Sequence, residues 1–233
     1  MDREKLFEDF LCQCKERQEI CGQGNPNADI LIIGKEPHDS EREGEELKKY
    51  IKTNWERCRV NNNERKKELV TWGFYQDLIE MIFEEKYESK ARNKNIIDFE
   101  ELAYTTELSS MPRLHSNYSK SKNAIYARLK FFSTSDFIKD FPIVILACGG
   151  YIKNNDKIRQ IDDTFHVNFE RRYDIAKNNW FCTHYNKENR QKQLVIHTRQ
   201  LSRDVHPDLL RKIASVVREY IGMINSQPLK TRV

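Results

Sequence analysis

Three short apolar segments interrupt a chain that is otherwise rich in polar and charged residues. They cover residues 28–34, 142–147 and 193–197, and turn-forming or polar residues flank each of them. A short run that is apolar at nearly every position is typical of a strand covered on both faces, as in a parallel sheet. We therefore expect three core strands of one sheet, with a weaker strand candidate at residues 102–108.

Apolar residues recur at helical spacing between these segments. Helices are predicted over residues 2–20, 47–58, 69–83 and 121–141, and an amphipathic helix with Pro207 in its first turn over residues 207–221. The charged residues 84–95 are expected to form an exposed connection. Within the polar stretch 153–190, residues 164–169 and 180–185 are further strand candidates.

Buried strands that alternate with helices predict an α/β fold. The expected form is a three-layer α/β/α sandwich around a central, mainly parallel sheet of four strands. No internal repeat or linker-like segment divides the 233 residues, a length that one domain commonly reaches. We expect a single domain over residues 1–233, with an N-terminal helix in residues 1–21 and the core in residues 22–222.

Composition and charge exclude some classes of protein. The longest apolar run, residues 141–148, is far shorter than the roughly 20 residues that cross a bilayer, and residues 1–10 lack the apolar part of a secretory signal. We expect a cytoplasmic protein with no membrane partner. The formal net charge of +4 permits binding to DNA without requiring it. The six cysteines are spaced irregularly, which predicts reduced thiols.

Two loops with unusual chemistry follow predicted core strands. Residues 34–39 read Gly-Lys-Glu-Pro-His-Asp, and residues 197–203 read His-Thr-Arg-Gln-Leu-Ser-Arg. In open α/β sheets, ligands bind outside the carboxyl ends of the strands. If both strands are central, the two loops face one cleft.

Together these loops resemble the motifs of the uracil-DNA glycosylase superfamily. Residues 24–37 are similar to the lead-in and first motif, which reads G-Q-D-P-Y-H in the well-known uracil enzymes. Residues 197–202 are similar to the H-P-S-P-L-S motif, with His197, Leu201 and Ser202 in register. The motifs are short, and the resemblance is taken to cover residues 22–222. It implies a monofunctional DNA glycosylase, which flips a target base and hydrolyses its N-glycosidic bond to leave an abasic site.

The resemblance implies roles for the residues at matching positions. Glu36 precedes Pro37 where the family carries the Asp or Asn that positions water, and His197 matches the histidine that donates a hydrogen bond to the departing base. This pair suits the reaction, because bond breakage builds positive charge on the sugar and negative charge on the base. Glu36 and His197 are the predicted catalytic residues, with water as the nucleophile. Leu201 matches the wedge that fills the space of the flipped base.

Further residues are predicted to bind DNA or the base. Phosphate or sugar contacts are expected from both loops, at Gly34, Lys35, Pro37, Arg199, Ser202 and Arg203. His38 replaces the tyrosine that excludes thymine, Thr105 is nearest to the asparagine that reads the pyrimidine, and Phe74 or Tyr75 is a candidate for stacking on the base. These departures favour an altered base, for example a damaged pyrimidine or a hypermodified pyrimidine of phage DNA. A role in DNA repair or phage defence follows.

No metal or other cofactor is expected. The cysteines before the first motif lack the spacing of the iron–sulfur members of the superfamily, and no cysteine lies between Cys58 and Cys148. Cys182, His184 and His166 match no regular zinc pattern. The predicted protein is a monomer whose partner is duplex or single-stranded DNA.

Alternatives remain open at this level. The chain could be a glycosylase-fold module that binds modified or damaged DNA with little or no catalysis, because the longer Glu36 replaces the family's Asp or Asn. It could instead act on free nucleosides. For single residues, Leu201 could be a packing residue, Glu36 an ordinary loop carboxylate, and Arg199 and Arg203 a solvated loop face.

Overall fold

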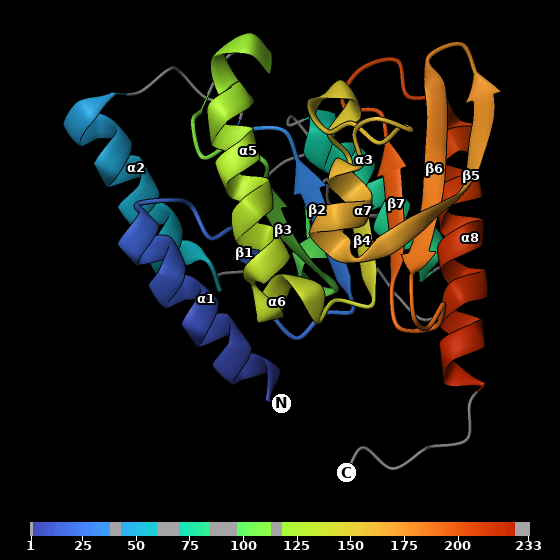
Figure 1. Cartoon of the computed structure of the whole chain (residues 1–233), viewed down its shortest axis with the longest axis horizontal. Coiled ribbons are helices and arrows are strands. Elements are labelled where there is room, and N and C mark those ends of the chain that lie inside the picture. Colours follow the sequence, from blue (N-terminus) through green and yellow to red (C-terminus); the bar gives the residue numbers. More distant parts are fainter. Residues whose placement is uncertain (1, 38–42, 60–69, 84–96, 113–117, 227–233) are drawn as a thin grey trace.

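The computed structural model describes residues 2–37, 43–59, 70–83, 97–112 and 118–226. The predicted connection at residues 84–95 and the predicted site residue His38 lie outside these ranges. The core is a mixed sheet of seven strands in the order β1-β3-β2-β4-β7-β6-β5 (Figure 1). The strands are β1 (Gln23–Gly24), β2 (Ile30–Gly34), β3 (Ala103–Glu107), β4 (Ile143–Leu146), β5 (Val167–Ala176), β6 (Asn179–Asn186) and β7 (Leu194–Thr198).

The four central strands β3, β2, β4 and β7 are parallel neighbours. They correspond to the four strands predicted at residues 102–108, 28–34, 142–147 and 193–197, and every residue of β2 and β4 is buried. The α/β class is thus confirmed. Burial on both faces explains why these strands are visible as apolar runs.

The prediction of a four-stranded sheet is wrong, because antiparallel strands extend the parallel centre on both sides. β1 pairs with β3, and β6 joins β7 to the edge strand β5. Most of β5 is exposed. A strand of an antiparallel hairpin can face water on one side, so it needs no continuous apolar run, and the sequence indicated only parts of β5 and β6.

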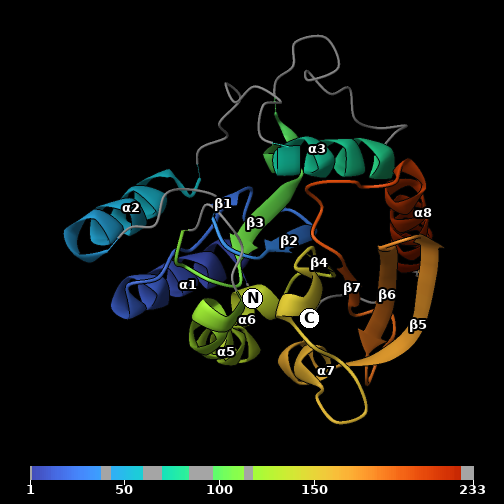
Figure 2. The same ribbon diagram turned by 90° about the horizontal axis from the view of Figure 1, so that it is seen from above.

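Helices cover both faces of the sheet (Figure 2). One apolar cluster joins Leu31, Ile33 and Val144 to residues of α1 (Arg3–Arg17), α5 (Tyr118–Thr134), α6 (Asp136–Lys139) and α7 (Gln160–Phe165). The other cluster joins Ile30 and Ile32 to α3 (Val70–Ile82) and α8 (Pro207–Asn225). Helix α2 (Gly44–Arg57) lies beside α1 (Figure 1). Its Trp55 packs against the first cluster, which also contains Cys58 at the end of the helix.

The predicted helices agree with the structure except at residues 121–141. That segment forms two helices, because Ser135 adopts an extended conformation and its hydroxyl accepts a hydrogen bond from the Ile138 amide. Serine is a preferred residue at this capping position, where it satisfies an amide that the new helix leaves unpaired. The break turns α6 so that Phe137 packs against Phe7 and Tyr104.

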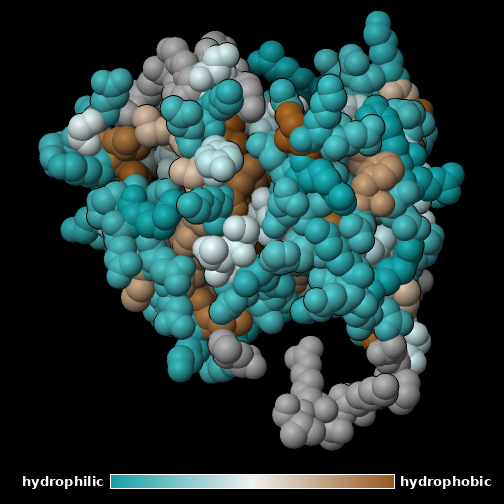
Figure 3. Space-filling view, in the orientation of Figure 1, coloured by the Kyte–Doolittle hydropathy of each residue, from teal (hydrophilic) through white to brown (hydrophobic). Residues whose placement is uncertain are grey.

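The visible surface is mainly hydrophilic (Figure 3). The large apolar side chains that are exposed among the described residues are spread over separate elements, and they are Val70, Tyr126, Ile158 and Phe169. None of the described helices combines the length and the apolarity needed to cross a membrane.

Candidate functional site

The carboxyl ends of the four parallel strands lie at one edge of the sheet. The first predicted loop follows β2, and the second begins within β7. Between them, β4 leads into Cys148 and the 3₁₀ turn η2 (Gly149–Tyr151). In the sheet register Gly34 pairs with Glu107 and Leu146 pairs with His197, so side chains from all four strand ends can meet there.

Glu36 is held by the turn that follows β4. The Tyr151 hydroxyl donates a hydrogen bond to Glu36 Oε1 at 2.9 Å. Lys35 Nζ lies 4.7 Å from the centre of the same tyrosine ring, a cation–π distance. Burial lowers the pKa of Lys35, which remains partly exposed. The site therefore carries a carboxylate and an ammonium side by side.

His197 contacts the other end of this turn. Its Nε2 lies 2.9 Å from the Gly149 carbonyl oxygen, which can only accept, so the proton is on Nε2. Burial lowers the pKa of His197 to about 4, and the ring is neutral at pH 7. The Trp180 ring meets the imidazole edge-to-face at 5.0 Å between centroids. The single N–H of this neutral imidazole is thus already used by the main chain.

Gly149 is the point where three loops meet. Its φ of +53° is in the left-handed region, which glycine adopts without strain. A Cβ added there would lie 3.5 Å from the Gln200 amide nitrogen and 3.9 Å from Lys35 Cε. The loops after β2, β4 and β7 are therefore in contact, and they bring Glu36 and His197 to the same turn.

Glu107, at the end of β3, is a site residue that the sequence analysis missed. Its Oε2 is shielded from solvent and has no hydrogen-bond partner among the described residues. Burial raises the pKa of Glu107 to about 8, and the negative charge of Glu36 adds to this shift while Arg128 opposes it. The sequence does show that a carboxylate, Glu107, lies at the end of a predicted strand. That Glu107 lies beside Gly34 and the first loop is shown only by the strand register.

Gly34 makes room for the Glu107 side chain. A Cβ built on Gly34 would overlap the Glu107 carboxyl group. We expect Gly34→Ala to lower the free energy of unfolding by about 1–3 kcal/mol, the usual cost of overpacking, as measured by urea unfolding.

The matched control for this prediction is Gly73→Ala in α3, where an added Cβ meets nothing within 4 Å. This control should leave stability unchanged or raise it by about 0.5–1 kcal/mol, because alanine favours the helix. Glu107→Ala should rescue Gly34→Ala in the double variant. Equal stability of Gly34→Ala and the parent protein would contradict the close contact.

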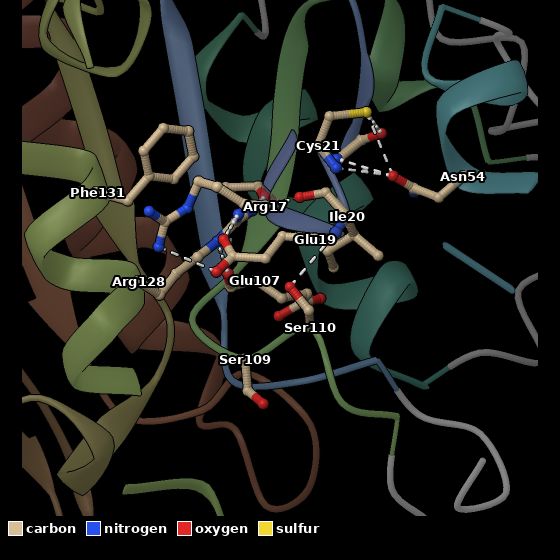
Figure 4. A network of polar contacts seen from close by, with 12 residues as sticks. Arg17, Glu19, Ile20, Cys21, Asn54, Glu107, Ser109, Ser110, Arg128 and Phe131 are labelled. Carbon is tan, nitrogen blue, oxygen red and sulfur yellow. Dashed lines mark hydrogen bonds and ion pairs between the residues drawn. The ribbon is translucent and has the colours of Figure 1, made fainter. Parts of the chain in front are cut away.

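A buried arginine on α5 fixes the main chain around Glu107 (Figure 4). The Arg128 side chain is 1% exposed, and it donates hydrogen bonds to Glu19 Oε2 at 2.7 Å and to the Ile20 carbonyl at 2.6 Å. It also reaches the Thr106 hydroxyl at 3.1 Å and the Glu107 carbonyl at 3.3 Å. Arg128 thereby ties the segment before β1 to the end of β3.

Two of the predicted base-contacting residues lie away from the strand ends. Thr105 is buried within β3, beside Ile32, and its hydroxyl donates to the Gln23 carbonyl. The role of Thr105 in reading the base stays a prediction, and the strand continues past Thr105 to Glu107. Phe74 is partly buried against the cluster beneath α3 and α8, as a packing residue would be.

The second loop is built differently from the prediction. Leu201 is fully buried in the apolar cluster beneath α3 and α8, so the packing alternative applies and the exposed wedge does not. Arg199 donates hydrogen bonds to the carbonyls of Gln200, Arg203 and Asp204 and so fixes the shape of its own loop. The other predicted DNA contacts are placed as follows: Gly34 is buried, Lys35, Pro37 and Ser202 are partly exposed, and Arg203 is exposed.

The residues considered for a metal are used in other ways. The Nδ1 of His184 lies 3.0 Å from Asp162 Oδ1, and Cys182 pairs across the sheet with His197. Within the described ranges, no three His, Cys, Asp or Glu side chains form a group that could hold a metal ion. All six cysteines are free thiols.

Comparison with known proteins adds no family to this description. No protein-family model matches the chain, and no curated protein matches it either.

Proposed function

We propose that the protein is a DNA glycosylase, which flips a target base out of DNA and hydrolyses its N-glycosidic bond. One observation carries this proposal: Glu36 and His197, far apart in the chain, contact the same Gly149–Tyr151 turn at the carboxyl ends of the parallel strands. Glu36 follows β2 and His197 lies in β7, the two neighbours of β4 in the sheet. A carboxylate and a hydrogen-bond donor on the two sides of one bond are what this reaction needs.

Glu36 acts on the sugar side of the bond. Its carboxylate stabilises the positive charge that develops on the sugar and orients the attacking water. The hydrogen bond from Tyr151 to Oε1 fixes the side chain, which reduces the reorganisation needed in the transition state. The chain supplies the ammonium of Lys35 nearby, which suits a contact with a DNA phosphate.

His197 acts on the base side of the bond. A neutral imidazole donates through one nitrogen only, and here Nε2–H is bound to the Gly149 carbonyl. For His197 to stabilise the leaving base, a base oxygen must replace that carbonyl as the acceptor. Because its low pKa keeps the ring neutral, the ionisation of His197 itself should add no pH dependence to base release above about pH 6.

The test is base release from defined DNA. The protein is incubated with single- and double-stranded oligonucleotides that carry uracil, mismatches, damaged pyrimidines or hydroxymethylated and glucosylated pyrimidines. We expect a free base, identified by mass spectrometry, and an alkali-labile abasic site in the same strand. No covalent adduct should be trapped by borohydride, since water rather than Lys35 attacks. Absence of base release from every substrate would refute the proposal.

A second candidate is a module that binds modified or damaged DNA without catalysis. The observations that favour it are the buried Leu201 and the occupied N–H of His197, because both argue against catalysis without bearing on DNA binding. DNA binding that weakens steeply with salt, with no base released, would identify this function, because phosphate contacts release counterions without any chemistry. Faster release from free nucleosides than from DNA would identify the nucleoside enzyme instead.

A further inference from the structure

The residue Glu107 is partly exposed, but its Oε2 atom is shielded from solvent in a way that is rare for a purely structural carboxylate. Its Oε2 has no hydrogen-bond partner among the described residues, although a buried carboxyl oxygen without a partner costs free energy. The adjacent backbone allows little movement, since the Leu108 and Ser109 amides donate to the carbonyls of Gly34 and Lys35. The main chain at Glu107 is therefore held beside the first loop, and the side chain has one oxygen without a hydrogen-bond partner among the described residues.

The charged and titratable groups around Glu107 disfavour its ionised form. Glu36 adds negative charge from the first loop, and Arg128, on α5, opposes it. Tyr75 of α3 and Cys148 after β4 also lie within electrostatic reach, and burial raises the pKa of each well above its usual range. Neither of these two groups ionises near neutral pH, so Glu107 is the one member of this set expected to titrate around pH 8.

We propose that Glu107 reads the target base as a neutral carboxylic acid, with its hydroxyl donating one hydrogen bond and its carbonyl oxygen accepting another. This inference rests on the proposed glycosylase function and assigns the residue that selects the base. A protonated carboxyl presents a donor and an acceptor side by side. That pair matches a pyrimidine edge with one acceptor beside one donor, namely N3 and the N4 amino group of cytosine or O4 and N3–H of uracil.

The proposed base class follows from this pairing. Pyrimidines that keep the N3/position-4 edge are accepted, including those with bulky substituents at C5, which lies outside that edge. Pyrimidines methylated at N3 are excluded, since the methyl group removes a donor or acceptor that the acid needs. A site that hydrogen-bonds its ligand through a buried polar group rejects such analogues strongly.

The first experiment measures the protonation of Glu107 in the protein alone. Infrared difference spectra between the parent protein and Glu107→Gln are recorded from about pH 6 to about pH 10. We expect the C=O stretch of a protonated carboxyl in the parent protein at pH 7, with loss of this band as the pH rises through about 8. A spectrum without the band at pH 7 would overturn the proposal whether or not the protein is an enzyme.

The second experiment separates the neutral acid from a carboxylate. Base release is measured over the same pH range for the parent protein, Glu107→Gln and Glu107→Ala. The parent rate should fall about tenfold per pH unit above pH 8 as the acid ionises. Glu107→Gln keeps a donor and an acceptor, so it should stay within about threefold at pH 7 and lose this pH dependence. Glu107→Ala should lose about 10²-fold at every pH.

The remaining outcomes are also decisive. Equal loss in both variants would show that an ionised carboxylate is required, and parent-like activity of Glu107→Ala would show that Glu107 does not contact the base. Either result overturns the proposal without affecting the proposed function. If the parent protein releases no base, the infrared band is recorded with free uracil, cytosine or 3-methyluracil. A shift with the first two alone supports base reading by Glu107, and an unchanged band refutes it.

Discussion

Glu36→Gln is expected to slow base release by about 10²- to 10³-fold, the usual loss when a group that stabilises transition-state charge is removed. The amide has the shape of the carboxyl group, and its oxygen can still accept the hydrogen bond from Tyr151. It carries no negative charge, however, and so gives little stabilisation to a positively charged sugar. Single-turnover release, with enzyme in excess over an oligonucleotide substrate, measures the chemical step directly.

Tyr151→Phe is the matched control for Glu36→Gln. It removes only the hydroxyl that donates to Glu36 Oε1 and leaves the carboxylate in place. We expect a smaller loss of about 5- to 10-fold, because one neutral hydrogen bond contributes roughly 1 kcal/mol. If Glu36→Gln released base as fast as the parent protein, Glu36 would have no catalytic role. The convergence of Glu36 and His197 would then be only a structural contact.

Arg128→Met is expected to lower the free energy of unfolding by about 3–5 kcal/mol. The variant removes a side chain that is 1% exposed, and it leaves the Glu19 carboxylate and the Ile20 carbonyl without their arginine. Removing one partner of a buried ion pair costs more than the pair itself contributes, since the groups left behind stay desolvated. Here the Ile20 carbonyl loses the Arg128 donor, and Glu19 keeps only its contact with the more exposed Arg17. Equilibrium unfolding in urea, followed by circular dichroism, gives the difference.

Arg17→Met provides the comparison for Arg128→Met, because both arginines bind Glu19. The Arg17 side chain is 38% exposed and lies 3.2 Å from Glu19 Oε1, so its loss should cost about 0–1 kcal/mol. Arg128→Lys should lie between the two, because lysine keeps the charge but lacks the planar fork that reaches Glu19 and Thr106 together. Similar losses for Arg128→Met and Arg17→Met would mean that burial adds nothing to this ion pair.

The central strands could be predicted because a strand that is buried on both faces is apolar at nearly every position. Residues 30–33 and 143–146 are apolar throughout because each side chain contacts one of the two helical layers. The outer hairpin of β5 and β6 has no such continuous apolar pattern. Most of β5 is exposed, including five consecutive residues, and its pairing with β6 is irregular, so its full length was not visible as a strand.

The sequence predicted where the candidate site lies, but it did not predict all of the residues that form it. The two loops lie at the strand ends where the α/β pattern placed them, and Glu36 and His197 reach the same turn. Tyr151 and Arg128 could not be assigned, since their roles depend on contacts between segments distant in sequence. For Leu201, the motif identifies the residue type but not its direction, and the structure turns it into the core. Thr105 and Glu107 lie in the same strand, and the sequence did not show which of the two lies at the strand end.

The two ends of the sheet carry features that discourage pairing with the strands of another molecule. β1 is only two residues long, so it offers almost no template for an added strand. β5 is longer, but its pairing with β6 shifts register between Phe169 and Arg171 and again between Asp174 and Ala176. Such bulges twist an outer strand, and the exposed charges of Arg171 and Arg172 add the cost of desolvation. The open hairpin is therefore poorly suited to seeding β-aggregation.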